Sequence, residues 1–196
     1  PVMDYLWQTG LDALKGADIL KTAPEKYTSN IEYGPDVVSQ GLKGMAQVHT
    51  ADLGSRILMT TSPNNAYDTH ANQAPAHTML WRNLSRAVSD FYQDLKDHNR
   101  NQEVVLLMFS EFGRRARDNG TGTDHGTGGV AFVIGDKVKG GLYGEYPSLE
   151  ESKLEDGGDL QHTVDFRSMY STILEKGLGL DPVTITGGNF EQLDFL

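Results

Sequence analysis

The sequence predicts an α/β fold in which a mostly parallel sheet is flanked by helices. Residues 56–61 and 104–109 are short apolar runs typical of buried strands, and an amphipathic helix separates them. A strand, a helix and a strand in this order form a right-handed unit with two parallel strands. The chain has 196 residues, 38% of them hydrophobic, which is typical of a single domain. We expect residues 1–34 to be an N-terminal helix and connector, and 35–196 the α/β part.

Four helices are predicted from apolar side chains that recur at steps of three and four residues. The second begins at Pro35, since proline is tolerated at a first helical position, and Gly54 ends it. The third carries the apolar face that separates the two strands. The predicted ranges are 3–20, 35 to about 53, 75 to about 97, and 165 to about 178.

The rest of the chain between residues 104 and 164 is predicted as strands and loops. Residues 104–109 contain no polar side chain and favour a central strand. A glycine-rich segment covers 113–129, and a further strand is expected at 130–134. The acidic stretch 145–159 is interpreted as a solvated loop.

Charge and composition exclude several classes of protein. The net charge of −10 disfavours binding to nucleic acids and to anionic membranes, which both need clustered Lys and Arg. The absence of Cys excludes disulfides and thiolate ligands, so a metal must be held by His, Asp, Glu or backbone oxygen. No apolar run approaches the ~20 residues of a membrane span. Small solutes and neutral polymers are left as partners.

Polar side chains follow the predicted strands at the sheet edge where ligands bind in open α/β folds. Asp68 and His70 come after the first strand, Glu111 follows the second, and Asp124 and His125 lie shortly downstream. This mixture of carboxylates and imidazoles suits Zn²⁺ or Mn²⁺ rather than Ca²⁺. The sequence therefore predicts a divalent metal site that includes these five residues.

Simpler interpretations exist for each motif taken singly. Asp68 is also suited to starting a turn, and Glu111 to pairing with Arg114 or Arg115. The glycines match neither a P-loop nor a dinucleotide fingerprint, and are suited to tight turns. Arg114 is a predicted anion-binding residue, for which the alternative is a solvated basic loop.

Five segments in succession closely resemble the bacterial family named domain of unknown function 1501, whose members are widely exported. The resemblance covers Gly34 to the C-terminus and places the chain near the alkaline phosphatase and sulfatase superfamily. It implies the C-terminal part of an alkaline-phosphatase-like fold, two metals, hydrolysis of phosphate or sulfate esters, and a periplasmic or extracellular location. The segments are YDTHANQ, FSEFGRR, GTDHGTGG, VKGGLYGEYPSL and DFRSMYSTIL.

The resemblance also implies roles for single residues. Asp68 and His70 match an Asp and a His that bind one metal, although the superfamily spaces them four apart, and His125 matches a later ligand of that metal. Glu111 stands where the superfamily has an Asp of the second site, and Phe112 where it has a His. This departure implies a weakened or altered second site unless Asp124 compensates.

An alternative alignment of the same segments takes Asp124 and His125 as the Asp-His pair and His162 as the late His. The first alignment is preferred because it places Glu111 directly at a strand end.

By the same resemblance, the superfamily's nucleophile lies in an N-terminal half that these residues lack. Ser62, Thr69 and Ser110 are the hydroxyls near the predicted cluster, and none has a nucleophile motif. We therefore expect a metal-dependent hydrolase that is incomplete without its N-terminal half, acting on a small-molecule or carbohydrate ester. The alternative is a catalytically inactive, exported binding or scaffold protein.

Overall fold

The computed structural model describes residues 2–63, 65–155 and 157–196, and the chain divides into two compact units. Residues Pro1–Ala66 and Met79–Asn101 form the first unit. Residues Tyr67–Thr78 and Gln102–Leu196 form the second. The assignment of the whole chain to one domain stays a prediction.

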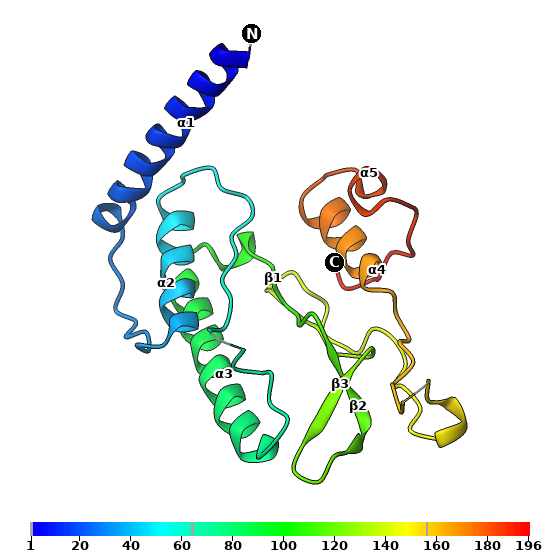
Figure 1. The fold of residues 1–196 in the computed structure, drawn as a ribbon. Helices are drawn as coiled ribbons and strands as arrows, with labels where there is room; N and C mark the ends of the chain where they lie inside the picture. Colours follow the sequence, from blue (N-terminus) through cyan, green and yellow to red (C-terminus); the bar gives the residue numbers. More distant parts are fainter. Residues whose placement is uncertain (1, 64, 156) are drawn as a thin grey trace. The chain divides into compact units, whose positions relative to one another are not determined.

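The first unit is helical, and its helices agree with the predicted ranges to within a few residues (Figure 1). Helix α1 is followed by a short 3-10 helix at Ala23–Lys26. The side chain of Asp36 caps α2 by accepting a hydrogen bond of 3.0 Å from the backbone N–H of Ser39. The helices are α1 (Val2–Thr22), α2 (Val37–Thr50) and α3 (Gln73–Asp97), of which residues 73–78 belong to the second unit.

The core of the first unit lies between one face of α2 and one face of α3. Helix α2 contributes Leu42 and Ala46, and α3 contributes Ala87, Phe91 and Leu95, all of them buried. These positions recur at the helical spacing that the sequence shows. Most apolar side chains of α1, in contrast, are exposed, among them Met3, Leu6, Trp7 and Leu14.

A fully buried carboxylate, Asp94 on α3, holds the connector after α1. It accepts hydrogen bonds from Tyr27, from Ser29 at 2.6 Å and from Tyr33 at 2.8 Å. Tyr27 also stacks on His98, with ring centroids 5.5 Å apart. A buried charge must be satisfied by such donors, so this network fixes residues 27–33 against the helix.

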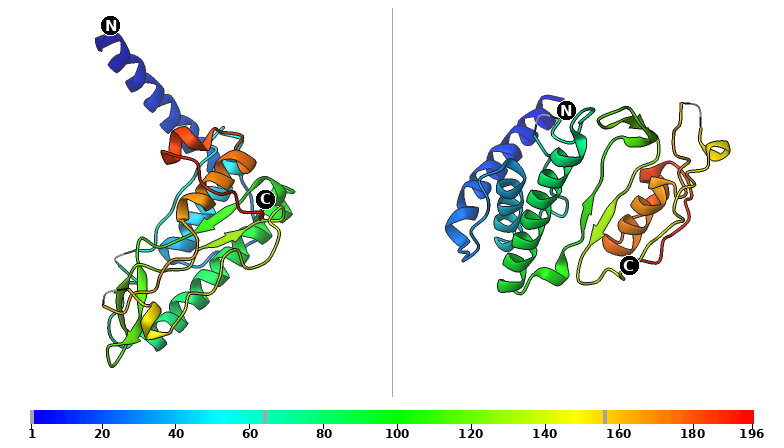
Figure 2. Two further views of the ribbon diagram at one scale, coloured as in Figure 1. Left: turned by 90° about the vertical axis from the view of Figure 1, so that its right-hand side faces the viewer. Right: turned by 90° about the horizontal axis from the view of Figure 1, so that it is seen from below.

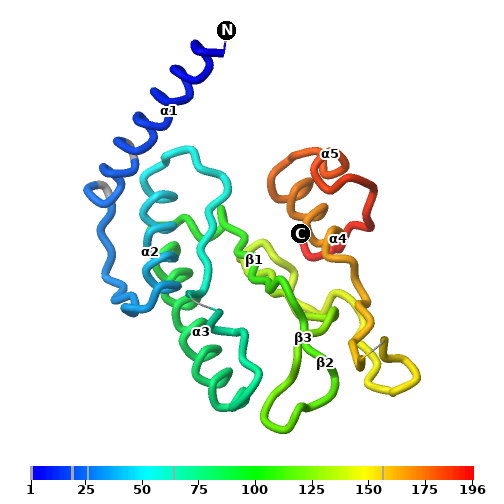
Figure 3. Tube along the Cα trace, viewed as in Figure 1, coloured from blue at the N-terminus to red at the C-terminus, as the bar shows by residue number. Residues whose placement is uncertain are grey.

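The predicted strand at residues 56–61 is wrong. This segment is an extended connection without strand pairing (Figure 3), and its side chains Ile57 and Met59 are 71% and 79% exposed. A strand needs a neighbour for its backbone N–H and C=O groups, and no strand in the described residues pairs with this one. Its apolar composition is strand-like, but composition alone does not supply that neighbour.

The predicted parallel sheet is also wrong, because the second unit contains two separate antiparallel pairs of short strands. Strand β1 (Leu106–Met108) pairs with β4 (Phe132–Ile134), with Leu107 opposite Val133 (Figure 2). Two antiparallel strands can be connected without a crossover helix. Between β1 and β4 the chain forms the other antiparallel pair, which is a hairpin. The central sheet of an alkaline-phosphatase-like fold is therefore not observed.

The glycine-rich segment forms that hairpin, which the sequence interpretation missed. Strand β2 (Gly113–Asp118) pairs with β3 (Thr123–Gly126), and the register shifts between Arg114 and Asp118. A Cβ on Gly113 would lie 1.8 Å from the carbonyl oxygen of Gly128, so a larger residue does not fit there. The Asn-Gly dipeptide at the tip is a hairpin signal in the sequence.

The C-terminal helix is confirmed. Helix α4 (Phe166–Thr172) continues as a π-helix, Ile173–Gly177, and Asp165 caps its start. A short helix that was not predicted, α5 (Pro182–Thr186), follows. Short 3-10 helices lie at Asn101–Glu103 and Glu151–Lys153. In the parts of the chain that the structure describes, no helix has the length and apolarity required to span a bilayer.

Candidate metal centre

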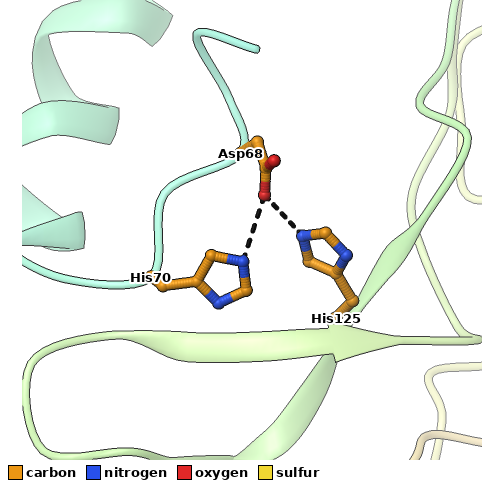
Figure 4. Close-up of side chains that lie close together, drawn as sticks. All are labelled: Asp68, His70 and His125. Atoms are coloured by element: carbon orange, nitrogen blue, oxygen red, sulfur yellow. Dashed lines mark hydrogen bonds and ion pairs between the residues drawn. The ribbon is translucent and has the colours of Figure 1, made fainter.

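Three side chains of the second unit converge on one point (Figure 4). Asp68 and His70 come from the loop before α3, and His125 comes from β3. The Nε2 atom of His70 lies 3.1 Å from Oδ1 of Asp68, and Nε2 of His125 lies 2.6 Å from the same oxygen. One potential ligand atom from each residue lies within 4.8 Å of the other two.

The loop that carries Asp68 and His70 is fixed by side-chain hydrogen bonds. Gln73 donates to the carbonyl oxygen of Thr69 at 3.0 Å and accepts from the hydroxyl of Thr123 on β3 at 2.9 Å. The Thr69 hydroxyl also lies 2.8 Å from Nε2 of His77. Because the bond between Gln73 and Thr123 runs from α3 to the hairpin, it helps to place the loop that carries His70 beside β3.

Arg114 joins the same two segments from the other strand of the hairpin. It lies opposite His125 in the register, and its guanidinium donates to the carbonyl oxygens of Thr123 at 2.7 Å and Tyr67 at 2.6 Å. Tyr67 directly precedes Asp68 in the chain. The guanidinium therefore helps to position Asp68 as well as the hairpin.

The two imidazole rings are packed by neighbouring rings. Phe112 stacks on His125 with ring centroids 3.8 Å apart and an interplanar angle of 12°. The guanidinium carbon of Arg114 lies 5.1 Å from the centre of the Phe112 ring. The rings of His70 and His125 are 4.7 Å apart. This packing restricts the rotation of His125.

A second carboxylate, Asp124, faces the other nitrogen of His70. Its Oδ1 lies 3.3 Å from His70 Nδ1 and accepts a hydrogen bond of 3.0 Å from the side chain of Asn119. Asn119 also donates to the backbone carbonyl of His70 at 3.1 Å. Both nitrogens of His70 therefore face carboxylate oxygens.

Hydrogen bonds keep both aspartates in the ionised form. The contact with His125 is the main cause of a lowered pKa for Asp68, and the hydrogen bond from Asn119 is the main cause of a lowered pKa for Asp124. The Asp68 side chain is 30% exposed, and the two imidazoles are more exposed still. The group is therefore open to solvent.

The geometry fits a divalent metal. Ligand bonds of about 2.0–2.2 Å in a tetrahedral site place neighbouring ligand atoms roughly 3.3–3.6 Å apart. The distance of 3.1 Å from His70 Nε2 to Asp68 Oδ1 is close to this range. The distance of 2.6 Å from His125 Nε2 to the same oxygen is shorter, so these two side chains would have to move apart to admit an ion. Two imidazole nitrogens and a carboxylate oxygen form a donor set that suits Zn²⁺ and Mn²⁺.

Residues 13–193 match the family described as "protein of unknown function (DUF1501)". The chain belongs to this family. No curated protein and no solved structure matches the chain. For this DUF1501 protein, the match confirms the family that the five sequence motifs indicate. No activity is assigned to this family, so hydrolysis and export stay predictions.

The structure of this DUF1501 protein brings some of the predicted site residues together and leaves others apart. Asp68, His70 and His125 form the group, and Asp124 contacts it through His70. Glu111 is exposed and lies outside the group of ligand atoms. The role of each predicted ligand, and of Arg114 in anion binding, stays a prediction.

The sequence interpretation missed three residues of this DUF1501 protein that contact the site. Phe112 was interpreted as a replaced ligand, but it packs on His125. Asn119 bonds to both Asp124 and His70, and the Asn-Gly signal at the hairpin tip could have indicated its place. The imidazole of His77 contacts the hydroxyl of Thr69, a contact that the sequence motifs do not indicate. Contacts between distant segments leave no such local signal.

Proposed function

We propose that this protein binds a divalent metal ion, Zn²⁺ or Mn²⁺, through Asp68, His70 and His125 and hydrolyses phosphate or sulfate esters. The observation that carries the proposal is the convergence of three ligand atoms from two distant segments within 4.8 Å. Sites with three protein ligands are typical of catalytic metals, because an open position is left for water or substrate.

The carboxylate and the two imidazoles of the site have different roles in the proposed metal binding. The carboxylate of Asp68 would offset part of the charge of the ion, and the imidazoles of His70 and His125 would contribute nitrogen ligands. When bound, the ion would supply polarisation of an ester oxygen and activation of an attacking oxygen. Since all three side chains are partly exposed, a substrate can reach the site from solvent.

The substrate proposed is a small-molecule or carbohydrate ester, and the proposed location is the periplasm or the outside of the cell. Both follow from the family resemblance. Exposure of the site supports the first of these, since a surface site accepts an ester group attached to a bulky leaving group.

The experiment measures turnover of aryl phosphate and aryl sulfate esters by the purified full-length protein, including the N-terminal half expected to supply the nucleophile, with Zn²⁺, Mn²⁺ or Ca²⁺. We expect turnover with Zn²⁺ or Mn²⁺ and its loss in His125→Ala, while Glu191→Gln, which removes an exposed charge elsewhere, keeps wild-type turnover. Stoichiometric metal without turnover of either ester class would reject the hydrolase and favour a binding or scaffold protein. The absence of any bound metal would reject both parts of the proposal.

A further inference from the structure

We infer that Asp124 and Phe112 are positioning residues that orient the two imidazoles for a single metal ion, and that they are not parts of a second metal site. This inference rests on the proposed function, because it concerns the same group of ligands. It differs from the two-metal arrangement that the family resemblance implies.

The contacts of Asp124 identify it as a partner of His70. When one imidazole nitrogen binds a metal, the other usually donates to a carboxylate or carbonyl, and this hydrogen bond fixes the tautomer and the ring orientation. His70 Nε2 faces Asp68, and its Nδ1 faces Asp124 at 3.3 Å. A proton on Nδ1 shared with Asp124 leaves Nε2 free to bind the ion.

Asn119 keeps Asp124 in this place. Its side-chain amide donates to Asp124 Oδ1 at 3.0 Å and to the carbonyl oxygen of His70 at 3.1 Å. Its side-chain oxygen accepts from the backbone N–H of Gly122 at 3.0 Å, which fixes Asn119 in the hairpin turn. The Oδ1 atom of Asp124 is therefore directed to the far side of the His70 ring from Asp68.

Phe112 positions the ring of His125, as Asp124 positions the ring of His70. Its ring lies parallel to the imidazole at 3.8 Å, so the stacking restricts the orientation of His125, and the phenyl ring itself supplies no ligand for a second metal. The guanidinium of Arg114 lies over Phe112 at 5.1 Å. A permanent positive charge there repels a second cation. Stacking and charge together favour a single ion.

The test titrates metal-free protein with ZnCl₂ by calorimetry and counts ions by native mass spectrometry. We expect one ion per chain in the wild type, unchanged in Glu111→Gln and in the control Glu191→Gln. Asp124→Ala should weaken zinc binding about 10- to 100-fold. Asp124→Asn keeps an oxygen acceptor and should bind more tightly than Asp124→Ala. Phe112→Leu should weaken binding about 2- to 10-fold through lost stacking.

The second readout is the tautomer of His70 in the zinc-loaded protein, from long-range ¹H–¹⁵N NMR spectra. We expect the proton on Nδ1 in the wild type and in Asp124→Asn, and a mixture of tautomers or faster ring exchange in Asp124→Ala. Circular dichroism verifies that each variant is folded. Two ions per wild-type chain, loss of an ion in Glu111→Gln, or a His70 proton on Nε2 would overturn the inference. No bound ion in the wild type would instead overturn the proposed function on which it rests.

Discussion

The two units of this protein each contain an aspartate that several side chains surround, and the two aspartates differ in exposure and in the chemistry of their partners. Asp94 in the first unit is 0% exposed and accepts from the hydroxyls of Tyr27, Ser29 and Tyr33. Asp68 in the second unit is 30% exposed and faces the imidazoles of His70 and His125.

This difference separates a structural carboxylate from a candidate ligand. The hydroxyls around Asp94 are neutral donors that satisfy a buried carboxylate, and Nδ1 of His98 lies 3.4 Å from its Oδ1. The imidazoles around Asp68 are themselves metal ligands, and solvent reaches all three side chains. We therefore expect changes at Asp94 to alter the free energy of unfolding, and changes at the Asp68 group to alter metal binding.

The largest expected effect is on stability. Asp94→Ala leaves three hydroxyls without their acceptor, and should lower the free energy of unfolding by about 3–5 kcal/mol. Urea denaturation followed by circular dichroism measures this. Asp97→Ala on the same helix removes an exposed carboxylate that accepts a hydrogen bond from Gln93, and should cost under about 1 kcal/mol. Equal effects of the two substitutions would contradict a structural role for Asp94.

The next effect is on metal affinity. His125→Ala removes a ligand atom and should weaken zinc binding by at least about 100-fold, more than changes to outer partners of metal ligands do. Competition with a zinc chelator of known affinity measures it. The matched control is His162→Ala, an exposed histidine outside the group, which should bind zinc like the wild type. Loss of binding in this control instead would support the alternative alignment, in which His162 is a ligand.

The buried hydroxyls of Tyr27 and Tyr33 also predict how the free energy of unfolding changes at high pH. Burial, with a further contribution from Asp94, raises the pKa of Tyr27 from 10.0 to about 12, and the pKa of Tyr33 is raised for the same reasons. Below pH 10 both tyrosines are protonated in the folded and the unfolded chain. Between pH 10 and 12 these two hydroxyls ionise mainly in the unfolded chain, so Tyr27 alone should lower the stability of the first unit by on the order of 2 kcal/mol, and Tyr33 adds to this loss.

Urea denaturation at several pH values tests this dependence, with Tyr27→Phe as the comparison. This variant lacks the titrating hydroxyl, so its stability should fall less steeply above pH 10. A wild-type stability that does not change between pH 10 and 12 would show that Tyr27 titrates normally.

The smallest effect concerns a third aspartate, Asp165, which caps α4. Hydrogen bonds from the side chain and backbone of Arg167 lower the pKa of Asp165 from 3.8 to about 2. Its contribution to stability is therefore complete above pH 4 and is lost as the pH falls towards 2. Asp165→Ala should cost about 1 kcal/mol at pH 7, as loss of a helix cap does, and less at pH 2. Thermal unfolding at both pH values measures the difference.

The helices could be predicted from the sequence because their signals are local. Apolar residues recur at helical spacing in α2, α3 and α4. Asp36 and Asp165 each cap a helix by accepting a hydrogen bond from a backbone N–H within the first turn that follows. The strands could not be predicted in the same way. Residues 56–61 and 104–109 both contain apolar runs, yet only the second forms a strand, because only it meets a partner, β4.

The candidate site shows the same limit. The types and order of Asp68, His70, Asp124 and His125 could be read from the motifs, since carboxylates and imidazoles in short succession are the material of metal sites. The arrangement of these side chains in space could not be predicted. That Asp124 faces the Nδ1 atom of His70 depends on the register of a hairpin and on Asn119, which lies 49 residues from His70 in the chain.

The central claim is that the open group around Asp68 holds one metal ion. Its most direct test is a crystal structure of the zinc-loaded protein with data collected at the zinc absorption edge. We predict one anomalous peak, about 2.0–2.2 Å from Asp68 Oδ1 and from the Nε2 atoms of His70 and His125. A peak bound to other side chains, or no peak within bonding distance of these three residues, would contradict the claim.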